Sequence, residues 1–123
     1  MAIWWVGLGG FLGANARYLL GGWISERWGA VFPYGTFVIN ITGSFILGFF
    51  MAYAQEHPWV APTARLLFAV GFVGAYTTFS TFEYETMRLI QEREMLLAML
   101  NIFGSVLTGM VAMFGGFALG EWI

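Results

Sequence analysis

The chain has 123 residues, of which 59% are hydrophobic and only 10% charged. A soluble domain carries roughly a quarter charged residues, so this chain has too little polar surface to face water on all sides. The net charge of −2 gives no basic field for nucleic acid. The lack of cysteine excludes disulfides and thiolate metal sites. The single histidine, His57, argues against a histidine-based metal site.

Four apolar segments make up most of the sequence. A membrane-spanning helix needs about 20 mostly apolar residues. The four segments cover about 3–24, 35–54, 65–82 and 95–119. Their short connections carry charged residues and prolines, and the tryptophans lie near segment ends, as in the aromatic belts of membrane interfaces. The sequence therefore predicts an all-α integral membrane protein, with residues 1–123 forming one transmembrane domain.

The first segment contains a cation, Arg17. A charge inside a span is costly and usually faces a partner or a water-filled cavity. An arginine towards the end of its span can also extend to the interface, so the residue alone leaves both interpretations open. In the first interpretation, Arg17 would attract anions into a vestibule.

The second and fourth segments are uncharged, but each has a polar stripe. Thr36, Asn40 and Ser44 recur every four residues and so share one helix face, as do Asn101 and Ser105 in the fourth segment. Inside a membrane these groups need hydrogen-bond partners, which a neighbouring helix or a polar pathway can supply. For the two stripes together, we favour a polar pathway.

Small residues form two further patterns. Gly9 and Gly13 make a G-x-x-x-G motif in the first segment. The fourth segment has a ridge of small residues at every fourth position, which comprises Gly104, Thr108, Ala112, Gly116 and Gly120. Such patterns favour tight helix contacts, and the sequence does not say whether these contacts lie within the chain or between chains.

The third segment ends in an unusual string, Tyr-Thr-Thr-Phe-Ser-Thr-Phe, over positions 76–82. Threonine and serine tend to disturb helical hydrogen bonding, so we expect a broken helix here, whose exposed carbonyls could bind a cation. Phe79 and Phe82 share a face if this stretch is locally helical. Phenyl edges carry partial positive charge and could contact a small anion, although phenylalanine pairs are more often packing residues.

Orientation in the membrane is weakly specified. The first and third connections carry Arg27, Arg88 and Arg93, whereas the second carries Arg65. Both termini of a four-span protein lie on one side, so this bias favours the first and third connections inside the cell. The counts are small, and insertion in both orientations stays open.

These motifs together resemble the Fluc (CrcB) family of fluoride channels. The stretch from Gly71 to Phe82 resembles the family signature. The other matching motifs are Gly9-Gly10, Gly13-Ala14 and Arg17-Tyr18 in the first segment, Pro33-Tyr34-Gly35-Thr36 with Asn40, Gly43 and Ser44 in the second, and Asn101 and Ser105 in the fourth. The resemblance covers all four segments in order.

The resemblance implies a dual-topology protein of the cell inner membrane, in which two antiparallel copies form a homodimer with two pores for passive fluoride export. The residues it implies for the pore are Phe79, Phe82, Asn40, Ser105, Thr81 and Thr36. Arg17 would lie in the vestibule. The third helix would be broken near its middle, where the carbonyls of Gly74 and Thr77 would hold a structural Na⁺ at the dimer interface. The roles of Glu85 and Asn101 are left open.

Two other functions suit a small four-span protein. A proton-coupled multidrug transporter would need an intramembrane carboxylate, but every glutamate lies in or near a connection or a terminus. A non-transporting membrane assembly subunit would not need Arg17 or the 76–82 string. An enzyme is not expected, because the sequence offers no nucleophile–base pair, metal cluster or phosphate-binding loop.

Overall fold

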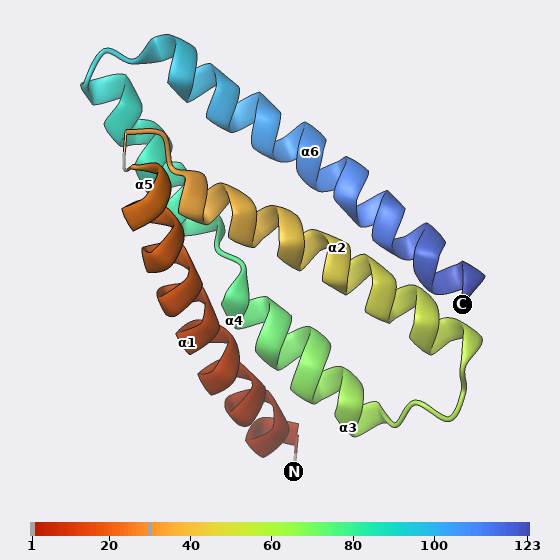
Figure 1. The fold of residues 1–123 in the computed structure, drawn as a ribbon. Helices are drawn as coiled ribbons and strands as arrows, with labels where there is room; N and C mark the ends of the chain where they lie inside the picture. The colour runs from red at the N-terminus through yellow and green to blue at the C-terminus, as the bar shows by residue number, and fades with distance from the viewer. Residues whose placement is uncertain (1, 30) are drawn as a thin grey trace.

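The computed structural model describes residues 2–29 and 31–123, and these ranges are almost entirely helical. The helices in chain order are α1 (Ala2–Trp28), α2 (Tyr34–Glu56), α3 (Pro62–Ala64), the π-helical η1 (Arg65–Val73), α4 (Gly74–Tyr76), α5 (Phe79–Gln91) and α6 (Met95–Trp122). The segments α3, η1 and α4 run on as one rod, and α5 follows after a bend (Figure 1). The prediction of an all-helical protein with four long segments and an interrupted third is confirmed.

Within the described ranges, three helical segments are long and apolar enough to cross a membrane. They are Tyr34–Glu56, Pro62–Gln91 and Met95–Trp122. The remaining long helix, α1, has 27 residues but carries Asn15, Arg17 and Arg27 among its polar positions. The protein is thus a multi-pass membrane protein, and α1 as a fourth span stays a prediction.

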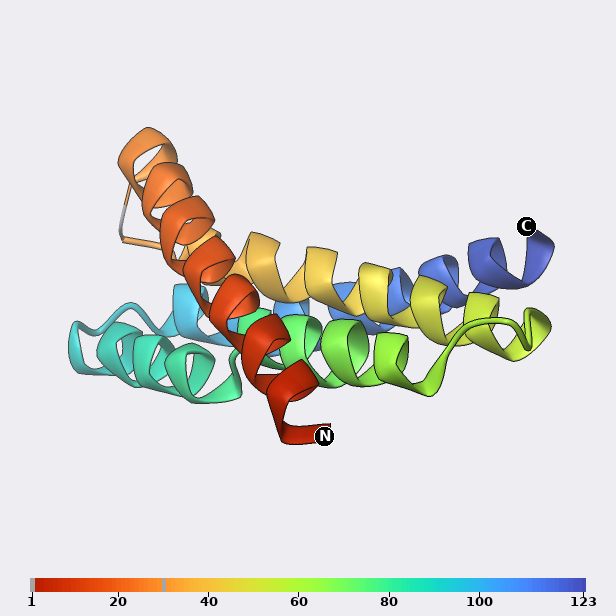
Figure 2. The same ribbon diagram turned by 90° about the horizontal axis from the view of Figure 1, so that it is seen from below.

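The four long segments pack as two pairs. α6 lies along α2, and α1 crosses the rod formed by η1 and α4 at a steep angle (Figures 1 and 2). Glycines allow both contacts, because a Cβ at Gly13 would collide with the backbone of Phe72, and one at Gly116 with the backbone of Phe45. Both small-residue patterns therefore bring helices together within the chain, although Gly104, in the same ridge as Gly116, borders open space.

Apolar side chains dominate the outside of the molecule, and polar ones occur inside it. On α6, the exposed side chains include Leu96, Phe103 and Phe114, which are 73%, 61% and 69% accessible. By contrast, Asn101 is only 1% accessible and Thr86 only 7%. Such a surface suits contact with lipid, where every buried polar group needs an internal partner.

Candidate functional site

The break in the third segment is confined to Thr77 and Thr78. Both residues have extended backbones, with φ −83° and ψ 155° at Thr77 and φ −150° and ψ 119° at Thr78. Thr78 then caps α5, since its Oγ1 accepts a hydrogen bond from the Thr81 N–H at 3.2 Å. Threonine suits this position because its side-chain oxygen replaces the carbonyl that a helix start lacks. Phe79 and Phe82 consequently lie on regular helix.

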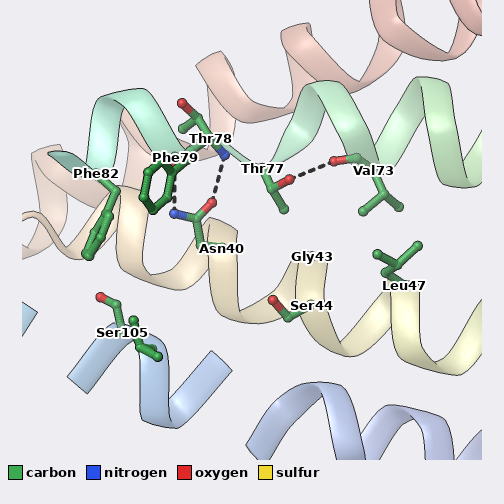
Figure 3. A pocket seen from close by; sticks show the side chains of 11 residues that line it. Asn40, Gly43, Ser44, Leu47, Val73, Thr77, Thr78, Phe79, Phe82 and Ser105 are labelled. Atoms are coloured by element: carbon green, nitrogen blue, oxygen red, sulfur yellow. Dashed lines mark hydrogen bonds between the residues drawn. The ribbon is translucent and has the colours of Figure 1, made fainter. Parts of the chain in front are cut away.

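Asn40 of α2 makes two hydrogen bonds to the backbone of the break (Figure 3). Its Oδ1 accepts from the Thr78 N–H at 2.8 Å, and its Nδ2 donates to the Thr78 carbonyl at 3.1 Å. The amide group of asparagine has two N–H bonds, so one is still available for another acceptor. Asn40 thus fixes the backbone of the break and keeps one donor free.

Because of these contacts, two backbone carbonyls lack the N–H donors that they would have in a continuous helix. In an uninterrupted α-helix, the Gly74 carbonyl would accept from the Thr78 N–H. The Thr77 carbonyl would likewise accept from the Thr81 N–H. Here the Thr78 N–H donates to Asn40, and the Thr81 N–H donates to the Thr78 side chain. Both carbonyls that the resemblance assigns to a cation therefore have their usual helical donors engaged by other groups.

A cavity of about 270 Å³, here called the first cavity, lies beside the break between α2, α5 and α6. It brings together Asn40, Phe79, Phe82 and Ser105 from three helices. The phenyl rings are tilted by 41° with centroids 5.8 Å apart, and Phe82 extends towards Ser105 (Figure 3). Phe79 is 70% exposed, so in a single chain no other part of the protein covers the first cavity on the side of this ring.

A second cavity, of about 220 Å³, lies on the other side of the break between α1, α2 and α5. Its lining includes Arg17, Thr36, Thr81 and Glu85, and Thr78 lines both cavities. Arg17 reaches the broken segment as well, because its Nε donates to the carbonyl of residue 75 at 3.1 Å. The predicted pore residues therefore form two groups, which meet at the break.

Asn101 lines neither cavity. Its Nδ2 donates to Thr86 Oγ1 at 2.8 Å, and its Oδ1 accepts from Ser105 Oγ at 3.2 Å. Thr86, which belongs to none of the predicted polar stripes, donates in turn to the Phe82 carbonyl at 2.8 Å. Its position four residues after Phe82, on the same helix face, is the signal that would have pointed to it.

A second contact that the sequence does not predict links α2 to α4. Thr42 Oγ1 lies 2.9 Å from the hydroxyl of Tyr76, just before the break. Thr42 falls between members of the predicted polar stripe and lines neither the first nor the second cavity. It therefore acts as an interhelical link, which is the ordinary role of a hydroxyl in a membrane.

Comparison with known proteins shows similarity along nearly the whole chain. A sequence model described as CrcB-like protein, Camphor Resistance (CrcB), matches residues 4–117. A protein of Acidobacterium capsulatum named fluoride-specific ion channel FluC is 50% identical over 119 residues, covering 97% of this chain and 95% of that protein. Proteins of the same name from Geotalea daltonii and Koribacter versatilis are 42% and 46% identical, covering 96% and 94% of this chain and 95% and 91% of their own lengths.

Proposed function

Because this chain belongs to the CrcB-like family, we propose that it is a fluoride channel through which fluoride leaves the cell down its electrochemical gradient, protecting the cell from fluoride toxicity. Relatives named fluoride-specific ion channels match almost its full length, and accordingly it is not an enzyme. The observation that carries the proposal is the first cavity, where Asn40, Phe79, Phe82 and Ser105 meet. The membrane would be the cell inner membrane.

The chemistry of the first cavity suits a small, strongly hydrated anion. Fluoride must exchange its hydrogen bonds with water for donors in the protein. The free N–H of Asn40 and the positive edges of Phe79 and Phe82 can supply such donors. Several weak sites in a row let an ion enter without being trapped.

The second cavity would form the approach to these sites. Arg17 places a positive charge among its lining residues, where it would draw anions in from water. The hydroxyls of Thr36 and Thr81 would give an anion polar contacts on its way towards the break, where Thr78 lines both cavities. This arrangement supports Arg17 as a vestibule residue rather than one that only extends to the interface.

The working unit would be an antiparallel homodimer with two pores. The cavity wall beyond Phe79 is open in the single chain, and a second copy would close it. The weak arginine bias between connections would allow copies of both orientations in one membrane. A symmetric dimer would repeat the cavity lining twice, which gives two pores.

A structural Na⁺ would fit the break. The carbonyls of Gly74 and Thr77 are hard oxygen ligands whose usual helical donors are engaged by other groups. The two carbonyls of one chain do not complete the coordination of an ion, so the second copy would supply further carbonyls at the dimer interface. When bound, the ion would supply positive charge that neutralises the exposed carbonyl dipoles and ties the two copies together.

A flux measurement tests this function directly. Liposomes loaded with potassium fluoride and containing the purified protein should release fluoride rapidly when valinomycin allows charge-balancing potassium flow. Matched liposomes loaded with chloride should not release their anion. Protein that is dimeric by size-exclusion chromatography yet passes no fluoride would contradict the proposal.

Phe79→Ile is expected to lower fluoride flux by about fivefold, since an aliphatic side chain lacks the positive edge of a phenyl ring, an interaction worth about 1 kcal/mol. The same liposome assay measures the effect. Phe114→Ile is the matched control, because Phe114 is 69% exposed on α6 and lines neither cavity. Equal flux in the two variants would show that the Phe79 ring does not contact the ion.

A further inference from the structure

Three consecutive hydrogen bonds link the first cavity to the interior of the helix pair α5 and α6. Ser105, which lines the cavity, donates to Asn101 Oδ1 at 3.2 Å. Asn101 donates to Thr86 Oγ1 at 2.8 Å, and Thr86 donates to the Phe82 carbonyl at 2.8 Å. Asn101 is 1% accessible, so its amide is held by these partners rather than by water.

The direction of these bonds determines what Ser105 can offer to an ion. A serine hydroxyl carries one proton and two lone pairs. With its proton directed to Asn101 Oδ1, Ser105 turns lone pairs, not a donor, towards the first cavity. An anion can accept from this hydroxyl only if the proton leaves Asn101, which costs a hydrogen bond.

We propose that Asn101 is a positioning residue of the pore. It accepts the hydrogen bond of the Ser105 hydroxyl and thereby weakens the binding of a passing anion by this hydroxyl. Asn101 acts through Ser105 and does not touch the ion. Thr86 keeps the amide of Asn101 in place, because it receives the Nδ2 hydrogen bond and is itself anchored on Phe82. The inference rests on the proposed fluoride channel function and assigns a reason for the buried asparagine.

The test is the fluoride concentration that gives half-maximal current in planar bilayers. Asn101→Ala is expected to lower this concentration by about threefold to tenfold, as one competing hydrogen bond is removed. Its maximal current should fall, because the ion leaves Ser105 more slowly. A purely structural role would reduce the number of working channels and so leave the half-maximal concentration unchanged, which would overturn the proposal.

The decisive comparison uses Ser105→Ala, alone and combined with Asn101→Ala. If Asn101 acts through the Ser105 proton, removal of Asn101 shifts the half-maximal concentration only when Ser105 is present. A shift of the same size in the Ser105→Ala background would overturn the proposal. Should Asn101→Ala fail to fold, Thr86→Val is expected to cause a smaller shift in the same direction, and no shift would count against the mechanism.

Thr42→Val is the matched control. It removes an interhelical hydrogen bond to Tyr76 that lies outside the first and second cavities, and it keeps the side-chain shape. Its half-maximal concentration should equal that of the unmodified protein, and a shift like that of Asn101→Ala would attribute the effect to looser packing. Absence of any fluoride current in the unmodified protein would overturn the channel function itself, whereas a saturable current without the Asn101 shift would overturn this inference alone.

Discussion

Asn40→Asp is expected to lower fluoride flux by at least about a hundredfold. The carboxylate can still accept from the Thr78 N–H, as Oδ1 of Asn40 does at 2.8 Å, but it loses the hydrogen bond that Nδ2 donates to the Thr78 carbonyl at 3.1 Å. Moreover, an ionised carboxylate donates no hydrogen bond and repels an anion. Two like charges about 4 Å apart at an effective dielectric constant of about 20 repel by about 4 kcal/mol, which corresponds to more than a hundredfold in occupancy.

Fluoride efflux from liposomes measures this loss, and size-exclusion chromatography establishes that the variant remains assembled. Thr42→Val serves as control on the same helix, since it removes a polar group two positions away that faces Tyr76 instead of the first cavity. The control should retain flux close to that of the unmodified protein. Undiminished flux in Asn40→Asp would mean that ions do not pass this amide.

The sequence predicts the break better than it predicts its extent. Threonine and serine clusters disturb a helix because their side chains compete for backbone groups, and this competition occurs at Thr78, which caps α5. The sequence does not predict that only two residues leave the helix. This extent depends on hydrogen bonds from Asn40, which lies 38 positions earlier in the chain. Local composition shows where a helix is weak, whereas a distant partner decides how it breaks.

The division of the site into two cavities could not be predicted from the sequence either. Thr36 and Asn40 are four residues apart and share a helix face, which suggests one continuous surface. In the structure the backbone of Thr78 meets α2 at Asn40, so the two residues line different cavities. By contrast, the predicted common helix face of Asn101 and Ser105 is found in the structure, where the two side chains are hydrogen-bonded on one helix.

The small-residue ridge of α6 shows the same limit. Gly104 and Gly116 belong to one pattern in the sequence, but only Gly116 is covered by α2. Periodicity identifies the face of a helix, and the crossing point of the neighbouring helix decides which part of that face is buried. Positions that look equivalent in sequence should therefore differ greatly in their tolerance of larger side chains.

Gly116→Val is expected to lower the free energy of unfolding by about 3 kcal/mol or more, the upper end of the cost of overpacking. A Cβ at Gly116 would collide with the carbonyl group of Phe45 on α2, and backbone cannot move aside as a flexible side chain can. The two helices would have to separate along their contact. Denaturant unfolding of the protein in detergent micelles, followed by circular dichroism, measures the effect.

Gly115→Val provides the control for this prediction. Gly115 precedes Gly116 on the same helix but has no atom of a neighbouring helix within 4 Å of a Cβ placed there. Both substitutions replace glycine with the same β-branched residue, so their intrinsic effects on the helix are equal, and the difference between them reports the α2–α6 contact alone. Similar losses of stability in the two variants would mean that α6 does not approach α2 at Phe45. A large loss for Gly116 alone would establish the close approach that places Ser105 of α6 opposite Asn40 of α2 in the first cavity.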